Sequence, residues 1–487
     1  MSAAARKLPP LLWRAGLPLA VAVIIALSPT PHGLAPNAWY YFAIFAAVIL
    51  ALITEPLPSA AVGFIGVTLI AALGLPFNAA QKADPSFPLP AEAIKWALAG
   101  FVNSTVWLIF GAFIFAMGYE KTGLGRRIAL VLVQRLGGRT LGLGYAITLT
   151  DLVLAPFTPS NTARSAGTIF PIVRNIPPLY GSQPGESARK IGAYLMWTAF
   201  AATCVTGSMF LTALAPNLLA RELVKKVTGI EITWGQWFMG FLPIGGLLLI
   251  VVPWLIYKIY PPEIRTSAEV PPWAARELAR LGRITWRELT MAALVLLALG
   301  LWIFGGSVID PALAALVVIS LMIVCRVVSW DDILGNAAAW NTLVWFATLI
   351  NLADGLNKTG FIVWFGQRAA ALLAGHSPLL VLVALVAFFF LIHYMFAGLV
   401  AHATALLPVV LTAGAAVPGM PVRTLALLLV FSLGIMGVLT PYATGPAPVY
   451  YGCGFITRRD FWRLGLIFGL IFLAALLLIG VPWLGVG

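Results

Sequence analysis

The sequence predicts an all-α polytopic membrane protein with about eleven transmembrane helices, two re-entrant helical hairpins and an inverted repeat. Three observations predict this fold class. The chain is 61% hydrophobic and 10% charged, whereas soluble domains are roughly half apolar and a quarter charged. Apolar runs recur along the whole chain, and two long ones are interrupted near their middle. This composition excludes a water-soluble globule, a disordered chain and a coiled coil.

The N-terminal segment is expected to enter the membrane directly. Met1 to Gly16 is short and basic, with Arg6, Lys7 and Arg14. The apolar run that follows, Leu17 to Leu27, has no convincing small-residue cleavage site. We therefore expect a first spanning helix, and a cleaved signal peptide is the alternative.

Apolar runs of spanning length then follow one another along the chain. A spanning helix needs about 20 apolar residues. Eleven runs come close to that length, and in chain order they are 11–28, 38–54, 58–75, 101–119, 190–212, 236–257, 290–306, 310–328, 340–356, 424–440 and 462–484.

Two further apolar segments, 140–176 and 377–417, are each too long for one helix. The first is interrupted between Pro156 and Thr162, and the second around Ala397-Gly398. We interpret both as helical hairpins that enter and leave the membrane on the same side. Two ordinary spans each are the alternative, which leaves the topology of the rest unchanged.

The basic residues indicate topology rather than a nucleic-acid partner. The net charge is +13, and the 30 Lys and Arg residues lie in short clusters between apolar runs. With a cytoplasmic N-terminus, 21 of these 30 residues lie on the cytoplasmic side, eight lie outside, and Arg164 belongs to neither group. The positive-inside rule therefore favours a cytoplasmic N-terminus and a C-terminus on the opposite side.

The two halves of the chain resemble each other on either side of a polar linker, 258–288. Lys121-Thr122-Gly123 recurs as Lys358-Thr359-Gly360, a shift of 237 residues, and Pro171 meets Pro408 at the same shift. Because five spans separate the copies, the second copy is inverted. Inverted repeats with interrupted helices at matching places are typical of secondary transporters.

Each repeat also has a second break downstream of its hairpin. These breaks lie at Thr212–Asn217 and at Gly437–Pro448, where Gly, Pro and Thr interrupt an apolar run. Unwound backbone at membrane depth is tolerated where it lines a cavity. Four breaks at symmetric places therefore predict a binding site, and structural kinks are the alternative.

Polar side chains at the first hairpin tip indicate anion chemistry. Ser160-Asn161-Thr162 offers hydroxyls, an amide and free helix-end N–H groups, although such residues are also common in turns and caps. Arg164 is expensive in an apolar segment, so we expect a fixed positive charge near an anion. Snorkelling or a structural pair with Asp151 is the alternative. Few carboxylates lie near the spans, which disfavours a cation path.

The second hairpin carries histidines instead of hydroxyls. At the repeat shift, Ser160-Asn161-Thr162 maps to Ala397-Gly398-Leu399, and Ser165 maps to His402. His393 lies on the other arm, and hydrogen-bonded structural histidines are the alternative. Cys204, Cys325 and Cys453 form no CxxC pair, so we expect no disulfide, metal or other cofactor.

The motifs around these residues resemble the divalent anion/sodium symporter family. They are Pro159–Arg164 with Phe170-Pro171-Ile172, His393–Ala397 with Ala401–Ala405, and Gly445–Gly452. The resemblance covers nearly the whole chain. It is greatest to the exchanger branch, which includes bacterial citrate/succinate and tartrate/succinate antiporters and plastid 2-oxoglutarate/malate translocators.

The resemblance implies a homodimer in a bacterial inner membrane, with a periplasmic C-terminus, no nucleic-acid partner and elevator-type alternating access. Scaffold helices would occupy 1–139 and 289–376. Transport halves would occupy 140–257 (hairpin 140–176, broken helix 190–228, helix 236–257) and 377–487 (hairpin 377–417, broken helix 422–454, last helix 462–484), joined through the cytoplasmic linker 258–288.

The resemblance also implies the substrate site. Ser160, Asn161 and Thr162 would contact one carboxylate of a di- or tricarboxylate anion. Ala397, Gly398, Thr440 and Pro441 would contact the other, and Thr444 and Gly445 complete the predicted site.

The sequence departs from sodium-coupled members of the family at Ala397-Gly398-Leu399, where those members carry a second Ser-Asn-Thr-like motif. Our hypothesis is that Arg164, His402 and His393 compensate charge in place of bound Na⁺. A charged empty site moves only at high cost, which favours sodium-independent antiport, and Arg164→Ala should abolish exchange without unfolding the protein. The alternative is a Na⁺-coupled dicarboxylate symporter.

Two other function classes are disfavoured. A membrane hydrolase would need a catalytic motif, and neither HExxH nor GxSxG occurs. A channel suits paired helix breaks less well than a carrier does, so we expect no enzyme activity. Succinate, malate, citrate, tartrate and 2-oxoglutarate all remain candidate substrates.

Overall fold

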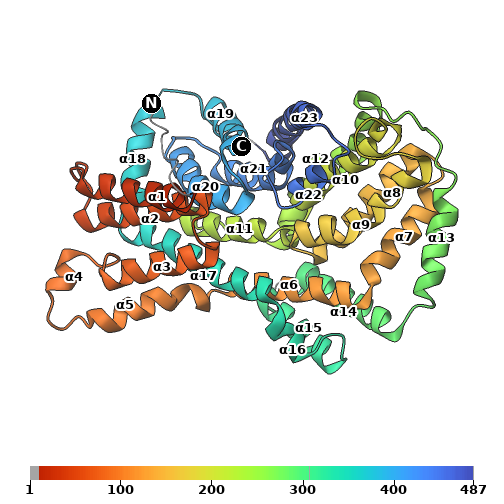
Figure 1. The fold of residues 1–487 in the computed structure, drawn as a ribbon. Coiled ribbons are helices and arrows are strands. Elements are labelled where there is room, and N and C mark those ends of the chain that lie inside the picture. The colour runs from red at the N-terminus through yellow and green to blue at the C-terminus, as the bar shows by residue number, and fades with distance from the viewer. Residues whose placement is uncertain (1–9, 306–307, 374, 486–487) are drawn as a thin grey trace, which may run out of the picture.

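A computed structural model describes residues 10–305, 308–373 and 375–485, and these residues form helices joined by short loops (Figure 1). No β-strand occurs in the described ranges, where the one β-type contact is an isolated bridge between Arg139 and Thr266. The expected all-α fold is therefore confirmed. Arg6 and Lys7, which entered the charge count, lie outside the described residues.

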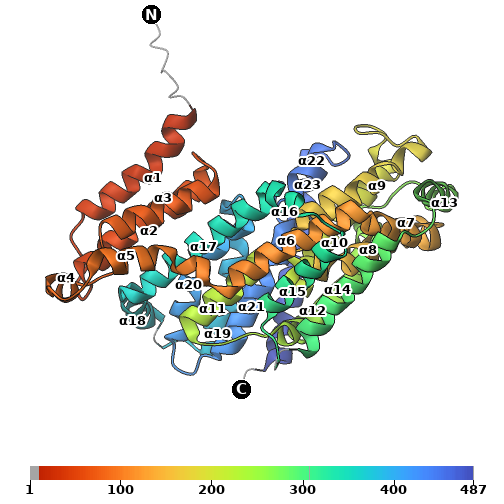
Figure 2. The same cartoon turned by 90° about the horizontal axis from the view of Figure 1, so that it is seen from below.

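The first part of the chain holds seven helices before the first hairpin. They are α1 (Pro10–Leu27), α2 (Pro36–Thr54), α3 (Ser59–Ala72), α4 (Ala79–Ala83), α5 (Leu89–Leu98), α6 (Ser104–Thr122) and α7 (Leu124–Leu136). Figures 1 and 2 show α1 to α5 gathered at one end of the molecule and α7 near the other end.

The first hairpin consists of α8 (Thr140–Leu154), an irregular turn, a π-helical segment (Thr162–Ile169) and α9 (Phe170–Arg174). The broken helix follows as α10 (Gly192–Met209) and α11 (Ala215–Thr228), and α12 (Trp234–Ile259) completes this half. The hairpin is interrupted at the predicted residues, whereas the helix break lies at Phe210–Leu214, earlier than the predicted Thr212–Asn217, because Pro216 lies in the first turn of α11.

The second half repeats this order after α13 (Val270–Leu281). Its helices are α14 (Trp286–Phe304), α15 (Pro311–Val324), α16 (Trp330–Gly335), α17 (Ala337–Lys358), α18 (Phe361–Leu373), α19 (Pro378–Leu391), α20 (Leu399–Ala415), α21 (Val422–Ile435), α22 (Ala447–Gly452) and α23 (Arg458–Leu484). Helices α19 and α20 form the second hairpin, and α21 and α22 flank the second break.

The element bounds follow the repeat. Helices α7 and α18 both contain 13 residues, and each begins one residue after the glycine of its Lys-Thr-Gly motif. The helical part of the second hairpin arm begins at Thr162 in one repeat and at Leu399 in the other, again 237 residues apart. The two repeats, although only weakly similar in sequence, thus contain helices that begin at equivalent positions.

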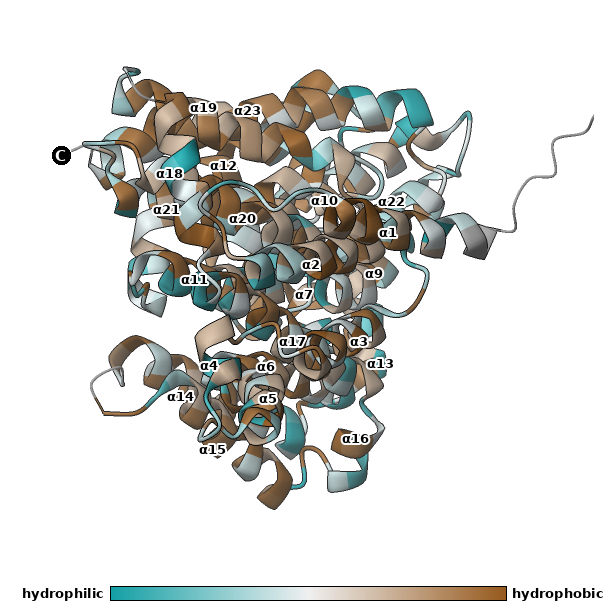
Figure 3. Cartoon of the chain, turned by 90° about the vertical axis from the view of Figure 1, so that its left-hand side faces the viewer, coloured by the Kyte–Doolittle hydropathy of each residue, from teal (hydrophilic) through white to brown (hydrophobic). Residues whose placement is uncertain are grey.

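Six described helices are long and apolar enough to cross a membrane, or seven if the bent pair of α5 and α6 counts as one span. Six more apolar helices have only 10–17 residues. The count of about eleven spans rested on apolar runs, and several of those runs form helices shorter than 18 residues. Figure 3 shows the hydrophobic colour over most helices and hydrophilic segments at loops and on α11.

Two amphipathic helices near the linker were not predicted. Helix α7 packs against α13, which lies inside the linker that was expected to be a loop. Arg126 Nη2 lies 3.0 Å from Glu277 Oε2, and Arg127 Nε lies 2.6 Å from Glu288 Oε1 at the start of α14. The linker therefore packs against α7 and forms an ion pair with the first half of the chain.

The broken helices lie at the centre of the molecule. All 18 residues of α10 are buried, and so are 12 of the 14 residues of α21. Small residues such as Ala and Gly are frequent in α10, which allows neighbouring helices to approach closely. This packing holds α10 and α21, which lead into the two breaks, in the interior.

Candidate functional site

The tip of the first hairpin is docked onto the second helix break. Asn161 Nδ2 donates a hydrogen bond of 2.7 Å to Thr444 Oγ1. A Cβ atom at Gly445 would collide with Thr162 Oγ1, so only glycine allows this approach. Farther along the arm, the Ser165 and Tyr450 hydroxyls lie 2.9 Å apart. The structure thus brings four predicted site residues together: Asn161, Thr162, Thr444 and Gly445.

The second hairpin docks onto the same break. His393 Nε2 lies 2.9 Å from the carbonyl oxygen of Ala443, and the Tyr442 hydroxyl donates to the carbonyl oxygen of Tyr394 at 3.0 Å. The segment Leu439–Pro446, which we call the central loop, therefore supports both hairpins. Sequence reasoning predicted each part but not that one loop holds both.

The tip of the second hairpin offers backbone rather than side-chain groups. Gly398 has φ +150°, a conformation that L side chains rarely adopt, and it directly precedes α20. Ala397 is exposed. The first N–H groups of α20 lack intrahelical partners, as at any helix N-terminus, and such groups attract anions. Thr440 is buried, and its hydroxyl accepts a 3.4 Å hydrogen bond from the Tyr442 N–H.

A cavity of about 650 Å³ opens beside the first hairpin tip. Ser160 and Thr162 line one wall, and residues of α6 and of the α16–α17 junction line the other, including Glu120 and Asn336. Ala397, Gly398, Thr440 and Pro441 are not among its lining residues. In this conformation the cavity therefore reaches the first half of the predicted site and not the second.

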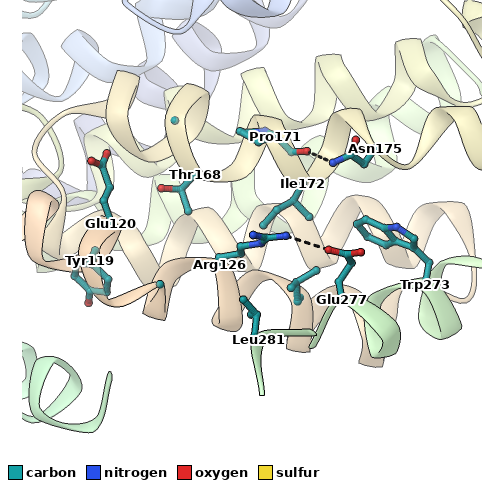
Figure 4. A pocket seen from close by; sticks show the side chains of 13 residues that line it. Tyr119, Glu120, Arg126, Thr168, Pro171, Ile172, Asn175, Trp273, Glu277 and Leu281 are labelled. Atoms are coloured by element: carbon teal, nitrogen blue, oxygen red, sulfur yellow. Dashed lines mark hydrogen bonds and ion pairs between the residues drawn. The ribbon is translucent and has the colours of Figure 1, made fainter. Parts of the chain in front are cut away.

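A second cavity of about 460 Å³ adjoins the first one (Figure 4). The two cavities share Glu120 and Gly167, so these residues lie at the neck between them. Figure 4 shows the Arg126–Glu277 pair at the α13 side of this cavity and Glu120 at its other end. Sequence reasoning missed Glu120, although it directly precedes the repeated Lys-Thr-Gly motif.

Arg164 forms the structural ion pair with Asp151 that we considered as an alternative. Its side chain is 0% exposed, and its Nε lies 3.3 Å from both carboxylate oxygens of Asp151. Its Nη1 donates to the carbonyl oxygens of Thr158 at 2.7 Å and Ala213 at 2.9 Å. Nη2 lies 3.4 Å from Thr203 Oγ1. Asp151 therefore balances the charge of Arg164, which favours the structural pair that we considered as the alternative to a fixed charge near the substrate anion.

The two predicted histidines form a buried pair. His393 Nδ1 lies 3.3 Å from His402 Nδ1, and Phe389 and Phe396 pack against the His402 ring. Two protonated Nδ1 atoms would point their hydrogens at each other. The contact therefore permits at most one imidazolium in the pair. His402 Nε2 is buried and has no hydrogen-bond partner in the described structure.

Metal-ligating residues do not gather anywhere in the ranges that the structure describes, where no group of three or more His, Cys, Asp or Glu could hold an ion. The three cysteines are free. The site instead consists of hydroxyls, amides, backbone groups and a histidine pair. These groups can donate hydrogen bonds to carboxylates.

Comparison with known proteins identifies close relatives. The family described as the sodium:sulfate symporter transmembrane region matches residues 10–486. A citrate/succinate antiporter of Escherichia coli K12 is 52% identical over 474 residues, which cover 97% of each chain. An L-tartrate/succinate antiporter of Shigella sonnei is 51% identical over 477 residues, covering 97% of this chain and 98% of the relative.

Two solved transporters share the fold at low sequence identity. The YdaH transporter of Alcanivorax borkumensis aligns with a TM-score of 0.54 at 15% identity, covering 88% of this chain and 98% of its own. MtrF of Neisseria gonorrhoeae aligns with a TM-score of 0.55 at 13% identity, covering 87% and 94%. At this level of identity the two structures support the architecture alone.

Proposed function

The chain belongs to the family of the sodium:sulfate symporter transmembrane region, and on that premise we propose that it exchanges di- and tricarboxylate anions across the bacterial inner membrane. The observation that carries this proposal is identity of about half over 97% of the chain to antiporters named for citrate, L-tartrate and succinate. It is a transporter and not an enzyme. Na⁺-coupled symport is not favoured by these relatives.

We propose that Arg164 occupies a place that a cation would otherwise fill. Its guanidinium is surrounded by oxygens from Asp151, Thr158, Ala213 and Thr203. Oxygen ligands are also what hard metal cations prefer. A permanent side-chain cation in such a cage supports an exchange that is independent of Na⁺.

The pairing of Arg164 with Asp151 changes the physical reason for obligatory exchange. Arg164 and Asp151 are neutral as a pair, so Arg164 does not leave a net charge in the empty carrier. At most one imidazolium remains, on His393 or His402. We infer that Arg164 maintains the shape of the hairpin, while the histidine pair supplies any positive charge that meets the substrate.

We propose that the substrate lies between the first hairpin tip and the start of α20. One carboxylate would contact Ser160, Asn161 and Thr162. The other would contact the N–H groups near Ala397 and Gly398, with Thr440, Pro441, Thr444 and Gly445 forming the floor. The support for this arrangement is the central loop, to which both hairpins are attached.

Elevator-type movement and a homodimer are further parts of the proposal. The two hairpins and two broken helices would move as a transport domain against scaffold helices that include α6 and α17. The N-terminus would be cytoplasmic and the C-terminus periplasmic. The cavity beside Ser160, which is bordered by α6 and α17, is consistent with a boundary between two such domains.

The test is uptake of labelled succinate into proteoliposomes. We expect rapid uptake into vesicles preloaded with succinate, citrate or L-tartrate, and little uptake into empty vesicles, whether or not an inward Na⁺ gradient is applied. Accumulation in empty vesicles that depends on Na⁺ would instead establish the symporter.

A matched pair of variants connects the activity to the site. Asn161→Ala removes the amide that reaches Thr444, and we expect exchange to fall at least tenfold. Gln183→Ala removes an exposed side-chain amide that lines neither cavity, and we expect exchange to stay near that of the wild type. Equal activity of the two variants would contradict the assignment of the first hairpin tip.

A further inference from the structure

A basic cavity lies where α6, α14, α15 and α16 meet; it shares Asp332 with the cavity beside Ser160 but none of the predicted substrate residues. It has a volume of about 590 Å³ and is lined by Lys121, Arg287, Arg326 and Asp332 together with the apolar side chains of Val327 and Val328. Figures 1 and 2 show α6, α14 and α15 side by side. Three cations thus share one cavity with one carboxylate.

The carboxylate of this cavity, Asp332, already has a cationic partner. Asp332 forms an ion pair with Lys121. The hydrogen bond from Lys121 lowers the pKa of Asp332 to about 2, so this carboxylate is anionic at neutral pH. In the described part of the chain, neither Arg287 nor Arg326 has a carboxylate within ion-pair distance. Two arginine charges in the cavity are therefore unbalanced.

The backbone holds these two arginines together. Arg287 Nη2 donates to the carbonyl oxygen of Arg326 at 2.9 Å. Arg326 itself has φ +54°, and only one other described non-glycine residue, Glu55, has positive φ. This conformation ends α15, because it lets the Arg326 and Val327 N–H groups donate to the carbonyl oxygens of Ile323 and Met322 at 3.0 and 2.9 Å. The end of α15 thus places Arg326 beside Arg287 in one cavity, where an anion would neutralise both charges.

The surroundings of the cavity are those of a lipid-facing surface. Trp286 beside Arg287 is 78% exposed, and Val324 near Arg326 is 77% exposed. Arg287 also lies in the first turn of the 19-residue helix α14, whose N-terminal dipole adds positive potential. Exposed tryptophan and arginine at a helix end are typical of the membrane–water interface. An anion with an attached apolar portion fits both features.

We propose that this cavity binds the phosphate group of an anionic phospholipid. The phosphodiester would lie between the Arg287 and Arg326 guanidinium groups, and the acyl chains would extend along α14 and α15 past Trp286 and Val324. Basic pockets between transmembrane helices on the cytoplasmic side bind lipid head groups in this way. Free phosphate shares the charge but lacks the apolar contacts.

Native mass spectrometry of the purified full chain, titrated with cardiolipin or phosphatidylglycerol, tests the proposal. Each arginine near a membrane surface contributes about 1 kcal/mol, which corresponds to roughly fivefold in affinity. For the double variant Arg287→Gln/Arg326→Gln, we expect lipid affinity to fall about 25-fold. The matched control is Arg276→Gln/Arg283→Gln, which removes the same charge outside the cavity, and we expect it to bind as the wild type does.

Further variants distinguish loss of charge from loss of folding. Competitors distinguish binding of lipid from binding of free phosphate. Arg287→Lys/Arg326→Lys keeps the charge and should recover most of the affinity, because only folded, charge-bearing protein regains binding. Excess inorganic phosphate should displace little lipid, and phosphatidylcholine should not compete. Equal loss in the cavity and control variants, or complete displacement by inorganic phosphate, would overturn the proposal.

Discussion

At the scale of single residues, Arg164 illustrates what a sequence can and cannot predict. An arginine inside an apolar segment is conspicuous, and Asp151 was the obvious candidate partner. The carbonyl oxygens of Thr158 and Ala213 could not be predicted, because backbone acceptors leave no pattern in the sequence. Through those contacts Arg164, which we predicted to compensate charge, also joins the first hairpin to the first helix break.

The first prediction concerns the stability of this pair. Arg164→Ala leaves the Asp151 carboxylate buried without its partner, which typically costs about 3–5 kcal/mol. We therefore expect Arg164→Ala to lower the thermal unfolding midpoint strongly, contrary to the sequence-based expectation of an intact fold. The double variant Asp151→Asn/Arg164→Gln removes both charges and should recover much of that midpoint. A double variant no more stable than Arg164→Ala would show that the pair is not coupled.

The second prediction concerns the central loop. Gly445→Ala adds a Cβ atom that collides with Thr162 Oγ1, so the first hairpin tip must move. We expect succinate exchange to fall at least tenfold, while the protein stays folded. Gly452→Ala is the matched control because a Cβ there meets no atom within 4 Å. Similar exchange rates for both variants would argue against close docking of the tip.

At the scale of elements, α11 connects two helices at one end of the molecule. Glu222 accepts hydrogen bonds from Asn103 Nδ2 at 2.7 Å and Thr105 Oγ1 at 3.2 Å, at the start of α6. Lys226 lies on the same face of α11, four residues on, and its Nζ is 2.8 Å from Asp354 Oδ1 near the end of α17. The opposite ends of α6 and α17 border the open cavity beside Ser160. Helix α11 thus joins α6 and α17 at one end, where a cavity of about 410 Å³ lies beside Thr105 and Glu222, and the cavity beside Ser160 opens at the other end.

The third prediction follows from this asymmetry. Glu222→Gln weakens the contact of α11 with the start of α6 and should shift the carrier toward its opposite conformation. With Ser160→Cys in a background where Cys325 and Cys453 are replaced by Ser, we expect an impermeant maleimide to label the introduced thiol less. Glu92→Gln removes an exposed ion pair on α5 and serves as the control. Unchanged labelling in Glu222→Gln would mean that α11 does not hold this state.

Helix breaks were predictable because Pro, Gly and Thr interrupt apolar runs, although the first break lies at Phe210–Leu214, a few residues before Pro216. Helices α7, α13 and α18 were missed because apolar-run counting does not detect short amphipathic helices. Their formation depends on packing: α13 forms where Arg126 pairs with Glu277 against α7. The number of membrane crossings remains a prediction.

At the scale of the whole molecule, the sequence indicated the repeat, the fold class and the hairpins. It did not indicate how the parts meet, because the contact of Asn161 with Thr444 joins residues 283 positions apart. The contact between His393 and His402 could not be predicted from the sequence either. Both histidines could be named from the sequence, but their direct contact, which limits the pair to one charge, required the fold.

The fourth prediction concerns the charge moved in each cycle. In a one-for-one exchange the carrier returns with the same side-chain charges, so only the difference between the two substrates crosses the membrane. We expect tartrate²⁻/succinate²⁻ exchange to be insensitive to a K⁺ diffusion potential set with valinomycin. Exchange of citrate³⁻ for succinate²⁻ should respond to it. A potential-dependent tartrate/succinate exchange would indicate an additional coupled ion.

The central loop also has a consequence for how the preferred substrate changes during evolution. Because Leu439–Pro446 supports both hairpins, one mutation there disturbs the contacts to both ends of a dicarboxylate. Such a mutation loses transport of every substrate at once and is removed by selection. New preferences for a hydroxyl or a third carboxylate are therefore expected to arise on the opposing wall, on α6 and the start of α17, where mutations leave the docked hairpins intact.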